Sequence, residues 1–362
     1  MRSYHISKVD SVTSLPIAVR MINLKSFSLE ELKDLVKGYG FKDYRGRQIF
    51  QWLWQKGVLQ IDKMTNISKK YRDLLLKNHY IGSLRILKRI KSEDSAVKYL
   101  FELEDGLTIE SVFIPEPDRK SVCVSVQVGC SLNCRFCATG RAGFDRNLNA
   151  WEIADQVICI QRIEGVRITN IVFMGMGEPM LNLDAVIEAC QILNSDLGLN
   201  IGARKMTIST VGIPEGIAKL TKNRMQLKLA ISLNASDDRK RSLLMPINRR
   251  YNISRIIKAV RDFQSARNSM VTIEYIMIDD VNISRTDAFR LLALTEKLRC
   301  KINLIPLNPF PGCEFSTPAT RTVETFREIL AKGNKTVTVR NSRGLDIGAG
   351  CGQLRSSGLL VS

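Results

Sequence analysis

Three cysteines, Cys130, Cys134 and Cys137, lie within eight residues of one another, and no fourth cysteine follows closely. Three thiolates can hold three irons of a four-iron, four-sulfur cluster, which leaves the fourth iron open to a substrate or cofactor. A structural zinc site usually requires four protein ligands, and the chain has only two histidines, His5 and His79. The spacing therefore favours a cluster that does chemistry.

Two other interpretations fit the same three cysteines. They could be buried small apolar residues, since free cysteine is among the most buried residue types. They could also bind zinc together with a distant fourth ligand. Four further cysteines have no regular spacing and are interpreted as structural or incidental: Cys159, Cys190, Cys300 and Cys313.

The charge of the chain is strongly positive and unevenly distributed. It has 54 Lys and Arg against 36 Asp and Glu, a net charge of +18. Residues 1–100 hold 20 basic and 9 acidic side chains, a net of +11. A concentrated positive field fits a polyanion, and nucleic acid is the leading candidate. A solvated basic face without a partner is the alternative.

Composition indicates a globular protein of the reducing cytoplasm. The chain is 44% hydrophobic and 25% charged, and no apolar run approaches the roughly 18 residues of a membrane span. Nine cysteines without a secretory signal argue against a disulfide framework. Residues 1–20 are expected to form a flexible N-terminal extension, or a short organelle-targeting arm, before the folded part opens at Met21.

Residues 21–91 are predicted to form a small, basic, helical accessory domain that binds RNA. Ser28 followed by Glu31 has the pattern of a capping box before an apolar stripe. Two further helices are predicted over Tyr44–Lys56 and Ile67–Asn78. The basic excess of this region is the reason to assign it to RNA.

The hydrophobic period changes after the helical region. Val97–Leu103 and Leu107–Ile114 are rich in β-forming residues and flank an Asp-Gly pair, which is a strong hairpin signal. Pro115 and Pro117 are expected to end the second strand. Residues 92–121 are therefore predicted to be a β-hairpin linker.

From residue 122 onward, strand and helix patterns alternate, which favours a parallel sheet. The predicted strands are Val122–Val128, Asn170–Met174, Lys205–Thr210, Lys228–Leu233, Val271–Ile278, Lys301–Leu307 and Thr336–Arg340. The predicted helices are Trp151–Ile163, Leu183–Leu193, Ile253–Phe263, Ala288–Leu298 and Val323–Leu330. We predict an α/β fold in which about six strand-helix units form a partial (β/α)6 barrel over residues 122–355, with a C-terminal tail at 356–362. An open doubly wound sheet is the alternative.

Polar and glycine-rich segments follow the predicted strands repeatedly, and in such a barrel these loops share one face. They are the cysteine loop, Gly175-Met-Gly-Glu-Pro179, Ser209, Ser232-Leu-Asn234, Asn308 and Gly348-Ala-Gly-Cys-Gly352. Each is weak evidence alone, since glycine and serine are common in turns. Their agreement predicts one site on that face.

These residues resemble the radical S-adenosylmethionine superfamily, whose signature is the Cys-x3-Cys-x2-Cys spacing. The aromatic Phe136 and the Gly-Glu-Pro after the second strand fit it too. More closely, residues 22–355 resemble the RlmN-type 23S rRNA adenine carbon-2 methyltransferases, which also act on tRNA. The matching motifs are Tyr44-Arg-Gly-Arg-Gln-Ile, Gln127-Val-Gly-Cys, Phe173-Met-Gly-Met-Gly-Glu-Pro, Lys301-Ile-Asn-Leu-Ile-Pro, Asn308-Pro-Phe-Pro-Gly and Ala349-Gly-Cys-Gly-Gln-Leu.

The resemblance implies a set of cofactor ligands. Cys130, Cys134 and Cys137 would hold the 4Fe-4S cluster, and a reductive reaction would give a 5′-deoxyadenosyl radical that the protein orients and shields. The residues that would contact S-adenosylmethionine are Gly177, Glu178, Ser209, Ser232, Leu233, Asn234 and Asn308. Similar proteins have histidine in place of Asn234, so a backbone contact is expected there.

The same resemblance implies three catalytic residues. Cys351 would carry a methyl group, Cys123 would attack the sulfur of Cys351 to release the product through a transient disulfide, and Glu110 would accept a proton. From the sequence alone, Cys351 lies between two glycines and is expected on a mobile loop. By the same reasoning Cys123 is expected to be a core residue of its strand, and Glu110 a strand residue that faces water.

The resemblance also implies partners and leaves rivals. The partners are 23S rRNA, tRNA and an electron donor such as flavodoxin or ferredoxin, with a cytoplasmic monomer that does not bind membranes. The nearest rival is the sister enzyme that methylates adenine carbon 8 and confers antibiotic resistance. Pro179, Ile114-Pro115 and Asn308-Pro-Phe-Pro-Gly312 favour the carbon-2 type. The distant rival is a non-catalytic RNA-binding protein that contains a metal.

Overall fold

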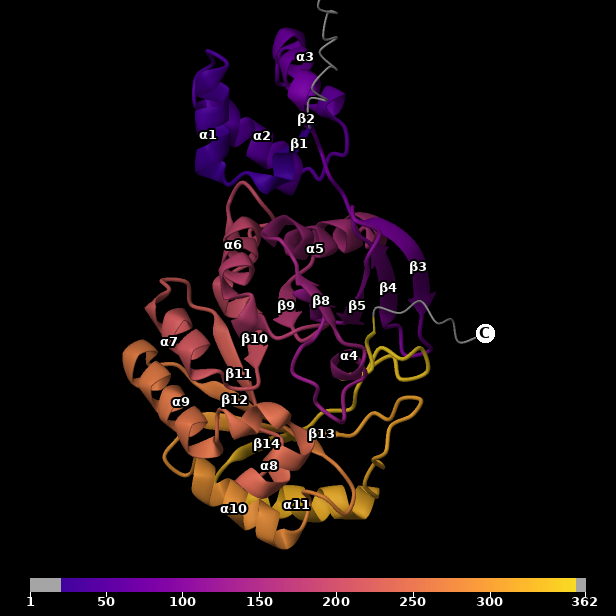
Figure 1. The fold of residues 1–362 in the computed structure, drawn as a ribbon, viewed down its shortest axis with the longest axis vertical. Helices are drawn as coiled ribbons and strands as arrows, with labels where there is room; N and C mark the ends of the chain where they lie inside the picture. The colour runs from indigo at the N-terminus through magenta and orange to yellow at the C-terminus, as the bar shows by residue number, and fades with distance from the viewer. Residues whose placement is uncertain (1–20, 356–362) are drawn as a thin grey trace, which may run out of the picture.

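The computed structural model describes residues 21–355 (Figure 1). The predicted N-terminal extension at 1–20 and the predicted tail at 356–362 lie outside the described residues. Helices α1 to α3 form a small unit at one end of the molecule, and a curved sheet with surrounding helices forms the larger body. Within the described part, no helix combines the length and apolar character that crossing a membrane requires.

The small unit contains the three helices that the sequence predicts. They are α1 (Leu29–Gly38), α2 (Tyr44–Trp54) and α3 (Lys69–Asn78), with the short parallel strands β1 (Ile22–Asn23) and β2 (His79–Tyr80) beside them. Ser28 and Glu31 form the predicted capping box at the start of α1. Leu32, Leu53 and Trp54 are fully buried, so the apolar stripes of the helices face one another and stabilise the unit.

One buried ion pair joins the small unit to the larger body. The Nζ atom of Lys25 lies 2.6 Å from Oδ1 of Asp155, and both side chains are 1% exposed. Oδ2 of Asp155 accepts hydrogen bonds from the Leu84 N–H at 2.9 Å and the Ser83 hydroxyl at 3.2 Å. A buried charge of this kind is stable only when paired and hydrogen-bonded, so the pair fixes the orientation of the small unit.

The sheet begins earlier than the sequence predicts. Residues Arg85–Lys91, expected at the end of the helical region, form strand β3, which pairs with β4 (Val97–Glu102). The predicted hairpin is present, as β4 pairs antiparallel with β5 (Thr108–Glu116). Strand β5 continues through Pro115 and ends at Glu116, directly before Pro117, so only the second of the two predicted prolines ends it. Residues 92–121 are thus part of the main sheet and not a separate linker.

All of the barrel strands belong to one ten-stranded sheet in the order β14-β13-β12-β11-β10-β9-β6-β5-β4-β3. The parallel strands are β6 (Arg119–Cys123), β9 (Asn170–Phe173), β10 (Met206–Thr210), β11 (Lys228–Ser232), β12 (Val271–Met277), β13 (Cys300–Pro306) and β14 (Thr336–Val339). Strands β14 and β3 stand at opposite edges and do not pair in the described structure. The barrel is therefore partial, as predicted, and the antiparallel β3–β5 extend it.

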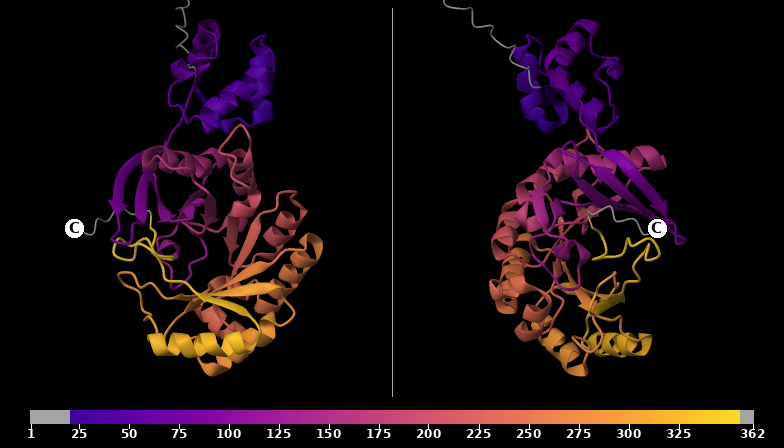
Figure 2. Two further views of the ribbon diagram at one scale, coloured as in Figure 1. Left: turned by 180° about the vertical axis from the view of Figure 1, so that it is seen from behind. Right: turned by 45° about the vertical axis from the view of Figure 1, so that its right-hand side comes forward.

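Helices cover the outside of the curved sheet (Figure 2). They are α5 (Ala150–Glu164), α6 (Leu183–Asn194), α7 (Pro214–Lys222), α8 (Asp238–Leu244), α9 (Ile253–Arg267), α10 (Arg285–Thr295) and α11 (Thr320–Lys332). Short 3-10 helices are η1 (Leu24–Ser26), η2 (Ile61–Lys63), η3 (Pro179–Leu181), η4 (Ala203–Lys205) and η5 (Pro246–Arg249). Helices α7 and α8 were not predicted.

The predicted strand Val122–Val128 is broken in two. Strand β6 ends at Cys123, and β7 (Gln127–Gly129) leaves the main sheet to pair antiparallel with β8 (Phe144–Asn147). The cysteine motif lies between β7 and β8, together with the short helix α4 (Ala138–Arg141). Because β7 and β8 pair, the two ends of the cysteine loop lie next to each other.

Candidate active site

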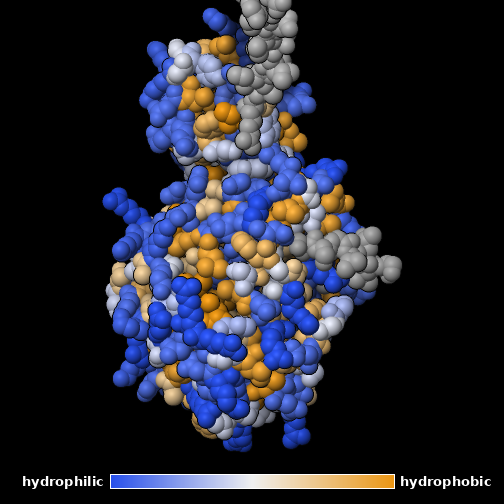
Figure 3. Space-filling view, viewed as in Figure 1, coloured by the Kyte–Doolittle hydropathy of each residue, from blue (hydrophilic) through white to orange (hydrophobic). Residues whose placement is uncertain are grey.

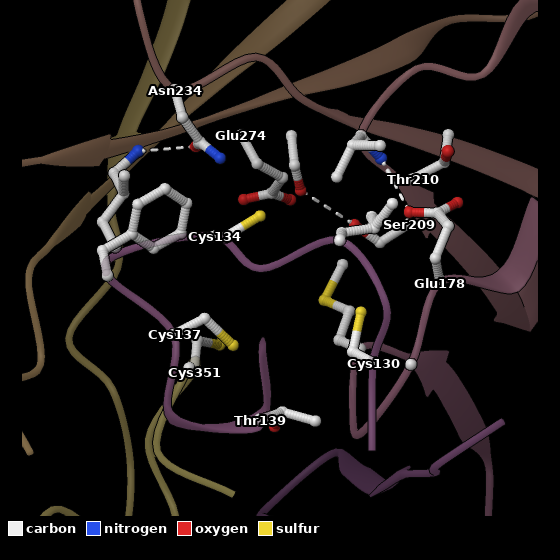
Figure 4. Close-up of a pocket in the computed structure, with 18 of the residues that line it drawn as sticks. Cys130, Cys134, Cys137, Thr139, Glu178, Ser209, Thr210, Asn234, Glu274 and Cys351 are labelled. Carbon is white, nitrogen blue, oxygen red and sulfur yellow. Dashed lines mark hydrogen bonds between the residues drawn. The ribbon is translucent and has the colours of Figure 1, made fainter. Parts of the chain in front are cut away.

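A cavity of about 170 Å³ opens at the carboxyl ends of the parallel strands. It is lined by Cys130, Leu132, Cys134, Phe136, Cys137, Thr139, Phe173, Met174, Gly175, Gly177, Glu178, Ser209, Thr210, Val211, Ser232, Asn234, Met245, Glu274, Ile276, Ile305, Cys351, Gly352 and Leu354. Figure 4 shows thiols, carboxylates and hydroxyls around this central cavity. Most residues of the predicted site thus come together from segments far apart in sequence. In Figure 3, apolar side chains gather at the centre of one face of the molecule and hydrophilic side chains border them.

The cysteine loop is held by its own backbone. The Cys130 N–H donates to the Gly143 carbonyl at 2.6 Å, and the Cys137 N–H donates to the Cys134 carbonyl at 3.1 Å. Gly129 has φ 75°, and a Cβ atom there would stand 2.1 Å from the Gly143 carbonyl oxygen. Only glycine fits this close approach, so Gly129 allows the loop to close.

The three thiols suit a metal-bound role. Burial raises the pKa of Cys130 to about 12, and burial likewise raises the pKa of Cys134 and Cys137. None of the three forms a disulfide. Buried thiols of this kind become thiolates when a metal replaces their protons.

The three cysteines line one cavity. Among residues 21–355, no three Cys, His, Asp or Glu side chains are grouped so that they could share one metal ion. The three sulfurs instead face one cavity, with Cys130 across from Cys137 (Figure 4). The cavity therefore presents three thiols that could serve as ligands of an iron-sulfur cluster.

Glu178 is fixed in place by backbone donors. Its Oε1 accepts from the Met180 N–H and its Oε2 from the Val211 N–H, both at 3.0 Å. Burial raises the pKa of this carboxyl, and hydrogen bonds from Thr210 and Val211 oppose the rise. Gly177 beside it has φ 97°, and a Cβ there would meet Gln127 at 2.5 Å. The segment therefore presents its backbone to the cavity.

Ser209 and Ser232, at the ends of β10 and β11, have hydroxyl oxygens 3.3 Å apart and both line the cavity. Asn234 adopts φ 62°, a left-handed conformation that asparagine tolerates well. Its Oδ1 accepts from the Ile276 N–H at 3.0 Å, so its side chain is engaged inside the protein. Leu233 is fully buried and does not line the cavity.

Two charged residues of the site were not identified from the sequence: Glu274, which lines the cavity, and Arg241, which lies behind its loops. Glu274 projects from the middle of β12, is 6% exposed, and accepts from Asn303 at 2.7 Å. Its place as a carboxylate inside an otherwise apolar strand could have indicated a buried functional residue from the sequence. Arg241 is fully buried and donates to the carbonyls of Val211 and Leu233, which holds two cavity loops together.

A second, smaller cavity lies beside the first. It is lined by Ile114, Cys123, Val172, Met174, Arg340, Ser342, Arg343, Ala349, Gly350, Cys351 and Leu354. Cys351 lines both cavities, whereas Cys123 lines only the second. Cys123 is buried, as expected of a core residue, but it also borders a cavity that a second thiol enters. The two cysteines that the resemblance pairs are therefore neighbours.

Asn308 positions the Cys351 loop from outside the first cavity. Its Nδ2 donates to the Cys351 carbonyl at 3.1 Å and to the Ser342 hydroxyl at 2.8 Å. The Ala138 N–H donates to the Gly352 carbonyl at 2.7 Å. These contacts join the Cys351 loop to the cysteine motif.

Glu110 does not face water, which corrects the expectation from its strand pattern. It is 7% exposed on β5, its Oε1 lies 3.2 Å from the Lys98 Nζ atom, and its Oε2 accepts from the Arg355 N–H at 2.9 Å. Burial raises the pKa of the Glu110 carboxyl and the charge of Lys98 opposes the rise. Glu110 lines neither cavity. It contacts the backbone next to Leu354, which lines both.

Comparison with known proteins defines the class first. The Radical SAM superfamily model matches residues 124–293. A crystal structure of a radical SAM methyltransferase from Sphaerobacter thermophilus is similar, with a TM-score of 0.89 and 41% identity over 93% of this chain and 100% of that chain. The enzyme is therefore a radical S-adenosylmethionine methyltransferase.

The family follows from the whole length of the chain. The model for the ribosomal RNA large subunit methyltransferase N-terminal domain matches residues 22–81. The probable dual-specificity RNA methyltransferase RlmN of Fervidobacterium nodosum is 42% identical over 92% of this chain and 97% of its own. The dual-specificity RNA methyltransferase RlmN of Syntrophus aciditrophicus is 44% identical over 93% and 97%. The chain belongs to the RlmN family.

Proposed function

We propose that this enzyme methylates carbon 2 of a specific adenosine in 23S rRNA and of an anticodon-loop adenosine in tRNA. The names of the relatives, which describe dual-specificity RNA methyltransferases, support RNA as the substrate. The observation that carries the mechanism is the place of Cys351, which lines both the cavity of the three cysteines and the cavity of Cys123. A thiol in that position can receive a group in one cavity and release it in the other.

The first cavity would hold the cofactors. Cys130, Cys134 and Cys137 would bind a 4Fe-4S cluster, and S-adenosylmethionine would lie against backbone groups near Gly177 and Asn234 and the hydroxyls of Ser209 and Ser232. Glu178 would position the backbone there, and Leu233 and Asn308 would act through the loops they hold. When bound, these groups supply a methyl group and a 5′-deoxyadenosyl radical.

The chain's own residues would then move the methyl carbon. The Cys351 methyl group would lose one hydrogen atom to the 5′-deoxyadenosyl radical, and its carbon would bond to carbon 2 of adenine. One electron and the carbon-2 proton then leave, so that protein and RNA are joined through the Cys351 sulfur and a methylene carbon. Cys123 as a thiolate attacks that sulfur: the S–S bond forms, the bond from sulfur to the methylene carbon breaks, and its electron pair passes to the base. The methylene carbon then takes up a proton and becomes the methyl group of the product. The disulfide is afterwards reduced by an external dithiol.

Glu110 would accept the carbon-2 proton before release. Its raised pKa brings the carboxyl nearer to the pH at which a general base works well. The contact with Arg355 places it beside the segment that follows Cys351. Motion of this segment when RNA binds would bring the carboxylate to the base.

The partners follow from charge and chemistry. The basic residues of 21–91 would supply much of the affinity for RNA, and a flavodoxin or ferredoxin would donate electrons to a monomeric, cytoplasmic enzyme. Mass spectrometry of nucleosides from RNA treated with the reconstituted enzyme tests the position of the methyl group. The proposal expects 2-methyladenosine in both RNAs, whereas 8-methyladenosine would identify the resistance-type reaction.

A further inference from the structure

Arg340 occupies an unusual position behind the two reactive cysteines. It directly follows β14, where its N–H donates to the Leu304 carbonyl at 2.8 Å. Its partly buried side chain lines the second cavity together with Cys123 and Cys351. The edge strand of the partial barrel thus delivers a permanent positive charge to the cavity where two thiols meet.

The guanidinium has no carboxylate partner there. In the described part of the chain no carboxylate lies within ion-pair distance of Arg340, and its side chain instead contacts the Met174 Sδ atom, 3.8 Å from Nη1. A guanidinium has five N–H donors, and a desolvated cation without a partner is costly. Arg146 offers a contrast, since it is paired with both Asp105 and Glu152.

Two thiols and two carboxylates are near enough to Arg340 for their negative charge to stabilise the guanidinium. Negative charge on Cys351 would stabilise the Arg340 guanidinium most, followed by negative charge on Glu274, Cys123 and Glu116. Together these groups raise the pKa of Arg340, although its burial alone would lower it. Arg343 also lines this cavity but is exposed. Of these four groups only Cys123 and Cys351 line the same cavity as Arg340, so a thiolate is the anion that the guanidinium would stabilise within this cavity.

Cys123 needs such a charge to react. The pKa of its thiol is raised to about 12, chiefly by burial and then by the neighbouring Cys351, while the charge of Arg340 opposes the rise. Only the thiolate is nucleophilic. Even beside Arg340, a thiol with this pKa is almost wholly protonated at neutral pH, so a nearby cation matters at the moment when the thiolate forms and attacks.

We propose that Arg340 is a positioning residue for thiol exchange, which stabilises the Cys123 thiolate as it attacks the Cys351 sulfur. This inference rests on the proposed function, because it assumes that Cys123 and Cys351 exchange. Arg340 forms and breaks no covalent bond and stays protonated throughout. The proton released by Cys123 passes to solvent.

The test measures formation of the Cys123–Cys351 disulfide without any turnover. The full-length protein is given a pulse of diamide, an oxidant that takes two electrons and two protons from a pair of thiols, between pH 6 and 10. Acid quenching, alkylation and peptide mass spectrometry then measure the disulfide over time. We expect Arg340→Met and Arg340→Gln to slow its formation roughly tenfold at neutral pH and to move the pH profile upward, because an adjacent opposite charge is removed.

Matched variants separate the charge from the fold. Arg340→Lys should retain most of the parent rate, and Arg321→Met, which removes an exposed arginine of α11 that does not line this cavity, should leave rate and pH profile unchanged. Near-ultraviolet circular dichroism identifies any variant that misfolds, and either neutral substitution alone suffices for the comparison.

Three results would count against the inference in different ways. Parent-like rates and pH profiles in folded Arg340→Met or Arg340→Gln would overturn it, and weaker RNA binding in the same variants would assign Arg340 to a phosphate instead. An equal decrease in Arg340→Lys would also overturn the role of charge. If the parent never forms the disulfide, the thiol pair of the proposed function fails as well.

Discussion

At the scale of single residues, the site contains carboxylates that are buried close to reactive groups. Glu274 and Glu178 line the cavity and Glu110 lies behind it, and burial raises the pKa of all three. The burial of these three carboxylates near the site could not be deduced from the spacing of residues in the sequence. Glu274 lies inside an apolar strand and its inward direction depends on how β12 packs between β11 and β13, which is a tertiary fact.

Glu274 gives a prediction about stability. Its pKa is raised above the ordinary 4.5, so the folded state binds more protons than the unfolded state just above pH 4.5, and stability falls as pH rises through this range. Glu274→Gln keeps the shape but removes the titration. We expect urea unfolding of the variant to show a smaller decline in stability with rising pH. An unchanged pH dependence would mean that the carboxylate is fully compensated by Asn303 and Arg340.

Glu110 gives a second prediction, about the reaction. Glu110→Gln keeps the hydrogen bond from Arg355 but cannot accept a proton at neutral pH. A missing general base typically costs about 10²- to 10⁴-fold in rate, so the variant should methylate RNA slowly while Cys351 is still methylated. Peptide mass spectrometry of Cys351 and nucleoside analysis measure the two steps separately. Normal RNA methylation would remove Glu110 from the mechanism.

At the scale of elements, capping and periodicity signals within a segment predicted most of the helices. They did not predict where a strand is interrupted or which strands pair. The capping boxes Ser28–Glu31 and Asn149–Glu152 mark the starts of α1 and α5, because side-chain caps satisfy free N–H groups at the helix start. The break between β6 and β7 and the membership of β3 in the main sheet depend on pairing with distant segments. No periodicity within the segment itself encodes such pairing.

The join between the small unit and the barrel is testable at this scale. Lys25→Met leaves Asp155 as a buried charge without its ion-pair partner, which typically costs about 3–5 kcal/mol. Lys33→Met breaks a surface pair with Glu30 of similar length, 2.7 Å against 2.6 Å, and should cost at most about 1 kcal/mol. Thermal unfolding compares the two. Equal destabilisation would show that the buried pair does not fix the unit.

At the scale of the whole molecule, charge and cavity lie in different parts of the structure. The helices α1 to α3 stand at one end, whereas α10 and α11 stand at the opposite end of the barrel (Figure 1). Composition alone located the basic excess in the N-terminal part of the chain. How that unit sits over the barrel depends on the Lys25–Asp155 contact, which joins segments 130 residues apart.

The accessory unit should carry the salt dependence of RNA binding. Replacing the exposed Lys42, Arg47, Lys69 and Lys70 with glutamine should weaken binding of a 23S rRNA fragment. The salt slope should fall by about one for each phosphate that the protein no longer neutralises. A control that replaces the exposed Lys297, Arg321 and Lys332 at the far end should change neither quantity. An equal effect in the control would make the RNA affinity a property of net charge only.

The central claim is that Cys351 carries the methyl carbon and Cys123 releases it. In Cys123→Ala, the methylene joined to the base cannot leave the Cys351 sulfur, so RNA should remain covalently attached to the protein after reaction with reduced, reconstituted enzyme. Denaturing gels would show a slow band that nuclease removes, and Cys351→Ala or the double variant should lack it. Normal turnover by Cys123→Ala without any such band would contradict the account.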